Sequence, residues 1–171
     1  MYPLDAVVIE PKPLDRLAAH VVDEHIGARQ QVAHGLRVGY VPDYCADEVA
    51  DHTAASALAL LRKLTPMDTS VRAGDWAAVK IAKPMKPFNQ TKFGFFGMGQ
   101  IGRAVHTRLR AFGFQFLAAD PGLTDAAAAE IGVSKCSAET LLQTADIISL
   151  HTPATDLTTE YFNAARLATM Q

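Results

Sequence analysis

The feature that most constrains the fold of this chain is the glycine-rich run Gly97-Met98-Gly99-Gln100-Ile101-Gly102. A largely apolar run, 93–96, leads into it, and apolar residues at helical spacing follow it. That context predicts a strand, a tight turn and a helix N-terminus in succession. In such a turn Gly97 would allow the sharp bend, Gly99 would leave room for a pyrophosphate, and Gly102 would let the helix pack close to the strand. The N–H groups at the start of the helix would then face the phosphates.

An acidic residue stands at the end of the next apolar run, 114–119. Asp120 follows the glycines at close to the spacing of about 20 residues expected for a carboxylate that binds the adenosine ribose. Its charge would repel a 2′-phosphate and no arginine follows it closely, which favours NAD over NADP. An Asp-Pro pair can also simply begin a turn, and a glycine-rich turn can bind nothing. The two features together favour a dinucleotide site.

From residue 91 onward, predicted strands alternate with predicted helices. The strands are expected at 92–97, 114–119 and 146–151, with a short one near Val133, and the helices at 101–112, 124–131, 137–142 and 164–170. This alternation predicts parallel strands joined by right-handed crossovers, that is, an α/β fold with a Rossmann-type doubly wound sheet. A complete sheet of this kind has the strand order 3-2-1-4-5-6. We therefore expect an incomplete sheet with 146–151 as an edge strand, which favours weak stability or association with another chain.

Before residue 91 the pattern is less regular. Apolar residues recur at helical spacing over 46–64, with acidic residues in the first turn and basic residues in the last. These features predict a long helix that ends before Pro66. The segment 68–90 is expected to be irregular. Within 1–42 the pattern indicates only short strands around one possible helix, and Pro42 suggests a boundary.

Composition excludes several other classes of protein. Of the 171 residues, 49% are hydrophobic and 20% are charged, which is typical of a globular chain. The net charge is -2 and the basic residues are scattered, which argues against a nucleic-acid partner. No apolar stretch approaches the ~18 residues that a membrane span requires. Cys45 and Cys136 lie far apart, so we expect no metal site and no disulfide framework, and the cytoplasm as the compartment.

The motifs together resemble those of the D-isomer-specific 2-hydroxyacid dehydrogenases, and in particular the subgroup that includes bacterial relatives of the C-terminal-binding-protein corepressors. The resemblance extends over about residues 35–170 in matching order and spacing. The stretches that carry it are Val41–Cys45, Glu48–His52, Leu58–Arg62, Gly74–Trp76, Gly94–Arg103, Ala111–Gly113, Asp120-Pro121, Ala145-Asp146 and His151–Pro153.

The resemblance implies a cofactor site, a domain division and partners. NAD would be bound with its pyrophosphate on the backbone of Gln100 and Ile101, its adenosine ribose on Asp120, and Thr152 on the far side of the crevice. Residues 1–42 would be part of the substrate domain, and 43–171 an NAD-binding domain without its C-terminal part. The implied partners are a small 2-hydroxy or 2-keto acid and a second copy of the chain, bound partly through the helix that begins at residue 46.

The resemblance also implies an activity, hydride transfer between NAD(H) and a D-2-hydroxy acid or 2-keto acid. In this family an arginine, a glutamate and a histidine do the acid–base and substrate-binding work in a continuation beyond Gln171, so we expect a truncated chain without catalytic residues of its own. His151 could donate a proton, but the resemblance assigns it no such role. Two alternatives stay open: a non-catalytic NAD(H)-binding sensor or corepressor-like module, and a degenerate, inactive product.

Overall fold

The computed structural model describes residues 44–170 of the chain. The chain divides into two compact units, and one of them comprises Cys45–Thr152 together with Phe162–Gln171. This unit contains the sheet, the helices around it and the whole candidate site. The strands expected within 1–42 lie outside the described residues, and the domain boundary expected after residue 42 stays a prediction.

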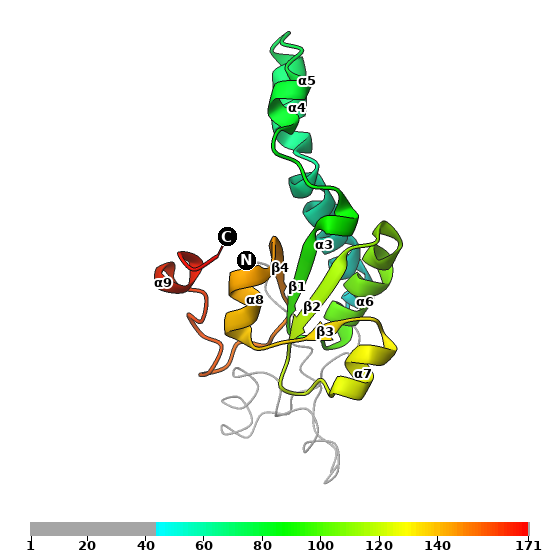
Figure 1. Cartoon of the computed structure of the whole chain (residues 1–171), viewed down its shortest axis with the longest axis vertical. Helices are drawn as coiled ribbons and strands as arrows, with labels where there is room; N and C mark the ends of the chain where they lie inside the picture. Colours follow the sequence, from blue (N-terminus) through cyan, green and yellow to red (C-terminus); the bar gives the residue numbers. More distant parts are fainter. Residues whose placement is uncertain (1–43, 171) are drawn as a thin grey trace, which may run out of the picture. The chain divides into compact units, whose positions relative to one another are not determined.

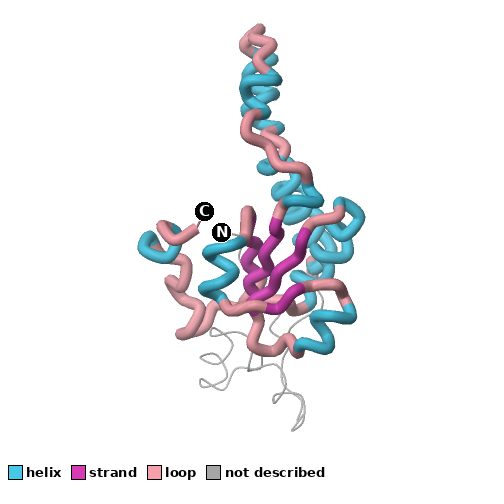
Figure 2. The backbone as a smooth tube through the Cα atoms, in the orientation of Figure 1, coloured by secondary structure: helices cyan, strands magenta, loops and turns pink. Residues whose placement is uncertain are grey.

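Four parallel strands form one sheet in the order β3-β2-β1-β4 (Figure 1, Figure 2). The strands are β1 (Lys92–Phe96), β2 (Gln115–Ala119), β3 (Ser134–Lys135) and β4 (Ile147–Leu150). β1 lies inside the sheet, with Phe95 in register with Ala118 on one side and with Ser149 on the other. The predicted parallel pairing is confirmed, and β4 is an edge strand among the described residues.

Helices cover both faces of the sheet, so the predicted doubly wound arrangement is confirmed. The connecting helices are α6 (Gln100–Leu109), α7 (Asp125–Glu130) and α8 (Ala138–Thr144). The ring of Phe95 faces α6, with its centroid 6.3 Å from that of His106. Gly94 faces α8, because a Cβ atom there would lie 2.8 Å from Leu141 Cδ1. Glycine at this position therefore lets α8 pack directly on the central strand.

Short polar side chains cap the N-termini of α7, α8 and a further helix, α9, and Ser137 and Asn163 supply the last two of these caps. Ser137 Oγ accepts the N–H of Thr140 over 3.1 Å at the start of α8. Asn163 Oδ1 accepts the N–H of Arg166 over 3.1 Å at the start of α9 (Ala164–Leu167), which is shorter than the predicted 164–170. Each cap satisfies a first-turn N–H group that has no acceptor within its own helix.

The longest described helix, α3 (Ala46–Leu61), packs along α6 through small side chains. Ala50, Ala54 and Ala57 are buried, and their spacing of four and three residues places them on one face of the helix. Methyl side chains let two helix backbones approach each other closely. None of the helices within residues 44–170 combines the length and the apolar character needed to cross a bilayer.

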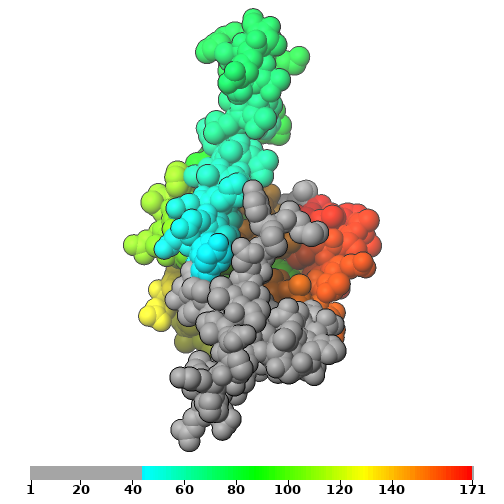
Figure 3. Space-filling model, turned by 180° about the vertical axis from the view of Figure 1, so that it is seen from behind, coloured from blue at the N-terminus to red at the C-terminus, as the bar shows by residue number. Residues whose placement is uncertain are grey.

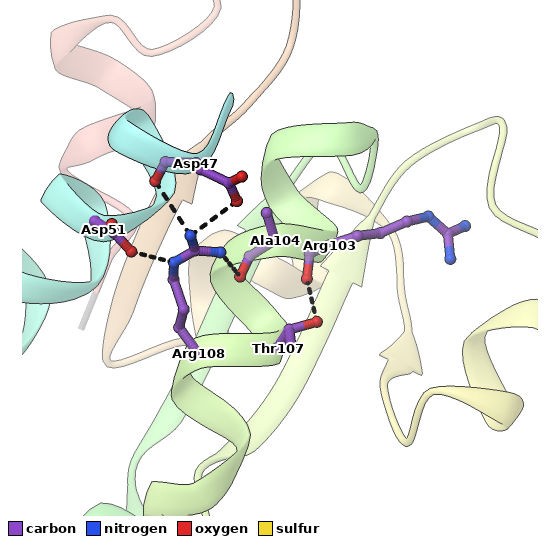
Figure 4. A network of polar contacts seen from close by, with 6 residues as sticks. All are labelled: Asp47, Asp51, Arg103, Ala104, Thr107 and Arg108. Atoms are coloured by element: carbon purple, nitrogen blue, oxygen red, sulfur yellow. Dashed lines mark hydrogen bonds and ion pairs between the residues drawn. The ribbon is translucent and has the colours of Figure 1, made fainter. Parts of the chain in front are cut away.

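One arginine ties α3 and α6 together beside this contact (Figure 4). Arg108 of α6 donates to the carboxylates of Asp51 and Asp47 of α3, the second over 2.9 Å, and to the carbonyl of Ala104 over 3.1 Å. Both carboxylates are mostly exposed, so each ion pair contributes little to the free energy of unfolding. The two partners lie one turn apart on α3, so the arginine bridges α6 to two successive turns of α3.

The helix predicted over 46–64 ends earlier than expected. Lys63 has a left-handed backbone with φ 53°, and it separates α3 from α4 (Leu64–Arg72). Pro66 lies inside the first turn of α4, where a missing N–H leaves no helical hydrogen bond unmade. The prediction of an irregular segment over 68–90 is wrong in part, because α4, α5 (Ala78–Ala82) and a short 3-10 helix (Phe88–Gln90) occupy much of it.

Residues 60–83 form what we call the arm. The Lys63 ammonium donates to the carbonyls of Ile81 and Lys83, over 3.0 and 3.2 Å, and so closes the arm at its base. α4 and α5 lie beyond the ends of the strands and make their contacts with each other and with α3 (Figure 1, Figure 3). The side chains of α4 and α5 therefore do not pack against the sheet.

The first residues of β1 and β4 are joined by a carboxylate. Asp146 Oδ2 accepts the N–H of Lys92 over 2.8 Å, and Oδ1 accepts the Lys86 ammonium over 2.6 Å. Burial raises the pKa of this carboxyl, but the hydrogen bonds from Lys86 and Lys92 outweigh that effect and leave the pKa below its usual value. The charged form is therefore stabilised by the fold.

We expect Asp146→Asn to lower the free energy of unfolding by about 1–2 kcal/mol at pH 7, because a charge-assisted hydrogen bond is lost. A carboxyl whose pKa is lowered by folding stabilises the fold above its unfolded pKa of about 3.9, and that stabilisation disappears as the pH falls through the lower folded value. The difference between variant and wild type should therefore shrink below about pH 4. Urea unfolding at several pH values measures both effects.

The matched control is Asp68→Asn, which removes the carboxylate of the exposed Arg72–Asp68 pair, 2.7 Å long. Exposed pairs contribute little, so this variant should unfold close to wild type. Equal losses from the two variants would show that the position of Asp146 between the strands has no special effect.

Candidate dinucleotide-binding site

The turn after β1 requires glycine at its first position. Gly97 has φ 94°, in the left-handed region. A Cβ atom there would lie 2.6 Å from the carbonyl oxygen of His151 and 2.8 Å from Thr152 Cγ2. Any side chain would therefore collide with the end of β4 as well as strain the backbone. The structure thus brings Thr152 beside the turn, as expected for a residue on the far wall of a crevice.

The other two glycines have opposite surroundings. A Cβ atom at Gly102 would lie 2.7 Å from the carbonyl oxygen of Gly97, so the first turn of α6 packs directly on the bend. At Gly99 a Cβ atom would meet nothing within 4 Å. Gly99 is therefore not needed for packing in the free protein, and the open space beside it is where the predicted pyrophosphate would lie.

The N-terminus of α6 borders that open space. Gly99 is its N-cap and offers no side-chain acceptor, and the N–H of Arg103 makes the first helical hydrogen bond, to Gly99, over 3.0 Å. The N–H groups of the first turn have no acceptor within the helix, and the helix dipole is positive at this end. Gln100 is exposed here, and Ile101 is half-buried against the core. This end of α6 therefore suits an anion.

Asp120 lies next to the turn, as its spacing predicted, but with contacts that the sequence did not reveal. Oδ2 accepts the N–H of Met98 over 2.6 Å, and Oδ1 accepts the N–H of Gly122 over 2.7 Å. A carboxylate has about four lone-pair sites, so two hydrogen bonds to the backbone leave further acceptor capacity for hydroxyl groups. The motif alone gave no signal for the Met98 contact, because it depends on where β2 ends relative to β1.

The histidine beside the turn is not placed to act as a proton donor. His151 Nε2 lies 2.8 Å from Ser149 Oγ, and burial lowers the pKa of the imidazole. A lowered pKa leaves the ring mostly neutral at pH 7, and its hydrogen-bond partner is a hydroxyl group rather than a carboxylate. Within residues 44–170, no group of three or more His, Cys, Asp or Glu side chains could hold a metal ion.

The comparison with protein families identifies this arrangement. Residues 54–171 match the family described as D-isomer specific 2-hydroxyacid dehydrogenase, NAD binding domain. The chain belongs to this family. Its cofactor is accordingly NAD, and the open face at Gly99, the N-terminus of α6 and the carboxylate of Asp120 suit the parts of that cofactor.

Several members of the family are similar to the chain. It is 31% identical to the glyoxylate reductase of Korarchaeum cryptofilum over 99% of this chain and 52% of the relative. It is 34% identical to the D-lactate dehydrogenase of Treponema pallidum over 81% of this chain and 41% of the relative. The crystal structure of D-lactate dehydrogenase from Aquifex aeolicus complexed with NAD and lactic acid superposes with a TM-score of 0.74 at 29% identity, over 84% of this chain and 42% of that one. The chain thus spans about half or less of these relatives.

We expect Gly97→Ala to lower the free energy of unfolding by about 2–3 kcal/mol, because a left-handed backbone and a backbone collision combine at that site. Gly99→Ala is the matched control, since its φ of -75° suits alanine and the added Cβ meets open space. It should change stability by less than about 0.5 kcal/mol. Thermal and urea unfolding measure both, and similar losses at the two positions would contradict this account of the turn.

Proposed function

We propose that this chain is the NAD(H)-binding part of an oxidoreductase that transfers a hydride between NAD(H) and a D-2-hydroxy acid or 2-keto acid. The observation that carries the proposal is the open backbone at Gly99, which adjoins both the N-terminus of α6 and the carboxylate of Asp120. A pyrophosphate and a ribose attached to it need these two features side by side.

Each predicted site residue has a role in this proposal. Gly97 and Gly102 keep the turn tight, and Gly99 gives the pyrophosphate access to the backbone. The N–H groups of Gln100 and Ile101 donate to the phosphates. The remaining residues contact the two ends of the cofactor: Asp120 accepts the hydroxyl groups of the adenosine ribose, and Thr152 contacts the cofactor from the end of β4.

The cofactor supplies the hydride chemistry when it is bound, and this chain's residues bind and orient it. The substrates proposed are small 2-keto acids, because the relatives include proteins named glyoxylate reductase and D-lactate dehydrogenase. His151 is neutral at pH 7 and bonded to a hydroxyl group. We therefore assign no acid–base step to the residues described here.

We expect the chain to bind NADH but not to oxidise it with glyoxylate, pyruvate or hydroxypyruvate. Binding is measured from the change in NADH fluorescence, and turnover from absorbance at the NADH band. Gly99→Val should weaken NADH binding by at least about tenfold, since its side chain fills the space for the pyrophosphate.

The control for this experiment is Asp125→Ala, which removes an exposed carboxylate from α7 without touching the turn. It should bind NADH like the wild type. Failure of the wild type to bind NADH would overturn the cofactor assignment, and turnover by the chain would show that catalytic groups lie within it.

The proposed second partner is another copy of the chain, bound through the arm. Five large apolar side chains are exposed there: Leu60, Leu64, Val71, Trp76 and Val79. Each is at least 52% exposed and Trp76 is 83% exposed, although such side chains usually lie inside. A high density of exposed apolar side chains is typical of protein interfaces, where tryptophan often contributes most. The arm thus supports a homodimer.

We expect Val79→Glu to raise the dissociation constant of the dimer by at least about thirtyfold, because it places a charge in an apolar interface. Sedimentation velocity over a range of concentrations measures the constant. Leu157→Glu is the control, since Leu157 is equally apolar, is 87% exposed and lies outside the arm. A monomeric wild type, or equal effects of both substitutions, would rule out the arm as the interface.

The proposed compartment is the cytoplasm. Cys45 and Cys136 are both free, and burial raises the pKa of the Cys136 thiol, which keeps it protonated and unreactive. Free thiols of this kind fit a reducing compartment.

A further inference from the structure

We propose that Asp120 is a positioning residue for the glycine turn as well as an acceptor for the ribose. Its carboxylate holds the N–H of Met98, and thereby fixes the peptide that leads to Gly99 in the orientation that presents open backbone to the pyrophosphate. This inference rests on the proposed NAD(H) site and deepens it, because it links the ribose end of the site to the phosphate end.

The hydrogen bonds between β1 and β2 end at Gly97. The N–H of Gly97 still donates to the carbonyl of Ala119, over 3.0 Å. The backbone leaves the strand at Gly97, whose φ is 94°, and the following N–H, that of Met98, meets Asp120 Oδ2 over 2.6 Å. The carboxylate therefore supplies the acceptor for an N–H that lies outside the β1–β2 ladder.

Met98, whose N–H the carboxylate accepts, is buried. Met98 is only 2% exposed, so its N–H has little access to water if the carboxylate is removed. A buried N–H without an acceptor is unfavourable, and the backbone would rotate to find one. Rotation of that peptide changes the position of Gly99, on whose open side a Cβ atom would meet nothing within 4 Å.

Asp120 is itself held by hydrogen bonds from the backbone of the turn that follows β2. Oδ1 accepts the N–H of Gly122 over 2.7 Å, and the Asp120 carbonyl accepts the N–H of Leu123, a buried residue, over 3.2 Å. The carboxylate is thus held by the β2–α7 turn on one side and holds the β1–α6 turn on the other. Both oxygens are thus oriented by backbone N–H groups and keep acceptor capacity for ribose hydroxyl groups.

The experiment separates the two roles with a ligand that tests only one of them. NAD and an analogue whose adenosine carries 2′,3′-dideoxyribose are titrated by calorimetry into the wild type, Asp120→Ala, Asp120→Asn and Asp125→Ala. The analogue cannot donate ribose hydroxyl groups to residue 120. We expect Asp120→Ala still to bind it about tenfold more weakly than the wild type does, because the turn is displaced. Asp120→Asn should recover about half of that loss, since its single amide oxygen can accept only one of the two N–H groups, of Met98 and of Gly122, and Asp125→Ala should match the wild type.

A second measurement needs no ligand. Hydrogen exchange of the Met98 amide, followed by NMR, should be at least about tenfold faster in Asp120→Ala than in the wild type or Asp125→Ala. Exchange at Val105 in the core should be unchanged, which shows that the variant is folded. If Asp120→Ala does not fold, Asp120→Asn decides through the same two readouts, with an intermediate effect expected.

Equal affinity of the wild type and Asp120→Ala for the analogue, or unchanged exchange at Met98, would overturn the positioning role. A wild type that does not bind NAD would instead overturn the proposed function. The exchange measurement would still test the contact between Asp120 and Met98 in that case, so the two failures are distinguishable.

Discussion

Three stretches of backbone meet at the carboxyl end of β1 with no space for a side chain between them. The end of β4 approaches Gly97, and the first turn of α6 approaches the same residue from the other side through Gly102. These are contacts between main-chain atoms, so no choice of side chains elsewhere can replace them. The close approaches at Gly97 and Gly102 set the position of the α6 N-terminus relative to β1 and β4.

The same constraint explains why so much of the sheet could be predicted from the sequence. Backbones touch at Gly97 and Gly102, and Gly99 between them faces open space, so three glycines at fixed spacing predict a strand, a turn and a helix in succession. The apolar runs that became β1, β2 and β4 are short and bounded by turn residues, as expected for strands buried on both faces. The pairing order, β3-β2-β1-β4, agrees with the order 3-2-1-4 of a doubly wound sheet, in which right-handed crossovers place helices on both faces.

Where the prediction was wrong, the structure depends on contacts between distant residues. The left-handed break at Lys63 has no local signal, and it is held by bonds from the lysine ammonium to carbonyls about 20 residues later in the chain. The sequence predicts that a helix ends before Pro66, but proline is also common in the first turn of a helix, and Pro66 lies in the first turn of α4. Periodicity cannot separate these two interpretations, because both place proline after a run of helical spacing.

The carboxylate of Asp120 shows a different limit. The motif predicts that Asp120 binds the ribose of a cofactor. The structure shows that its carboxylate also accepts a hydrogen bond from the backbone N–H of Met98. A spacing of residues carries no information on which backbone N–H will lack an acceptor once two parallel strands stop pairing. That information comes from the bend at Gly97 together with the register of β1 against β2, which places Asp120 one residue beyond the last paired residue of β2.

The helix that bears the proposed phosphate site, α6, packs against the bend at its first turn and against α3 farther along. Gly102 fixes its start against the bend, and further along Arg108 fixes it against α3 while alanines let the two helices lie close. Because the first-turn N–H groups can bind an anion only where the turn presents it, a rotation of α6 by a few tens of degrees would separate them from Gly99. The packing of α3 on α6 therefore contributes to the proposed phosphate site through the orientation of α6.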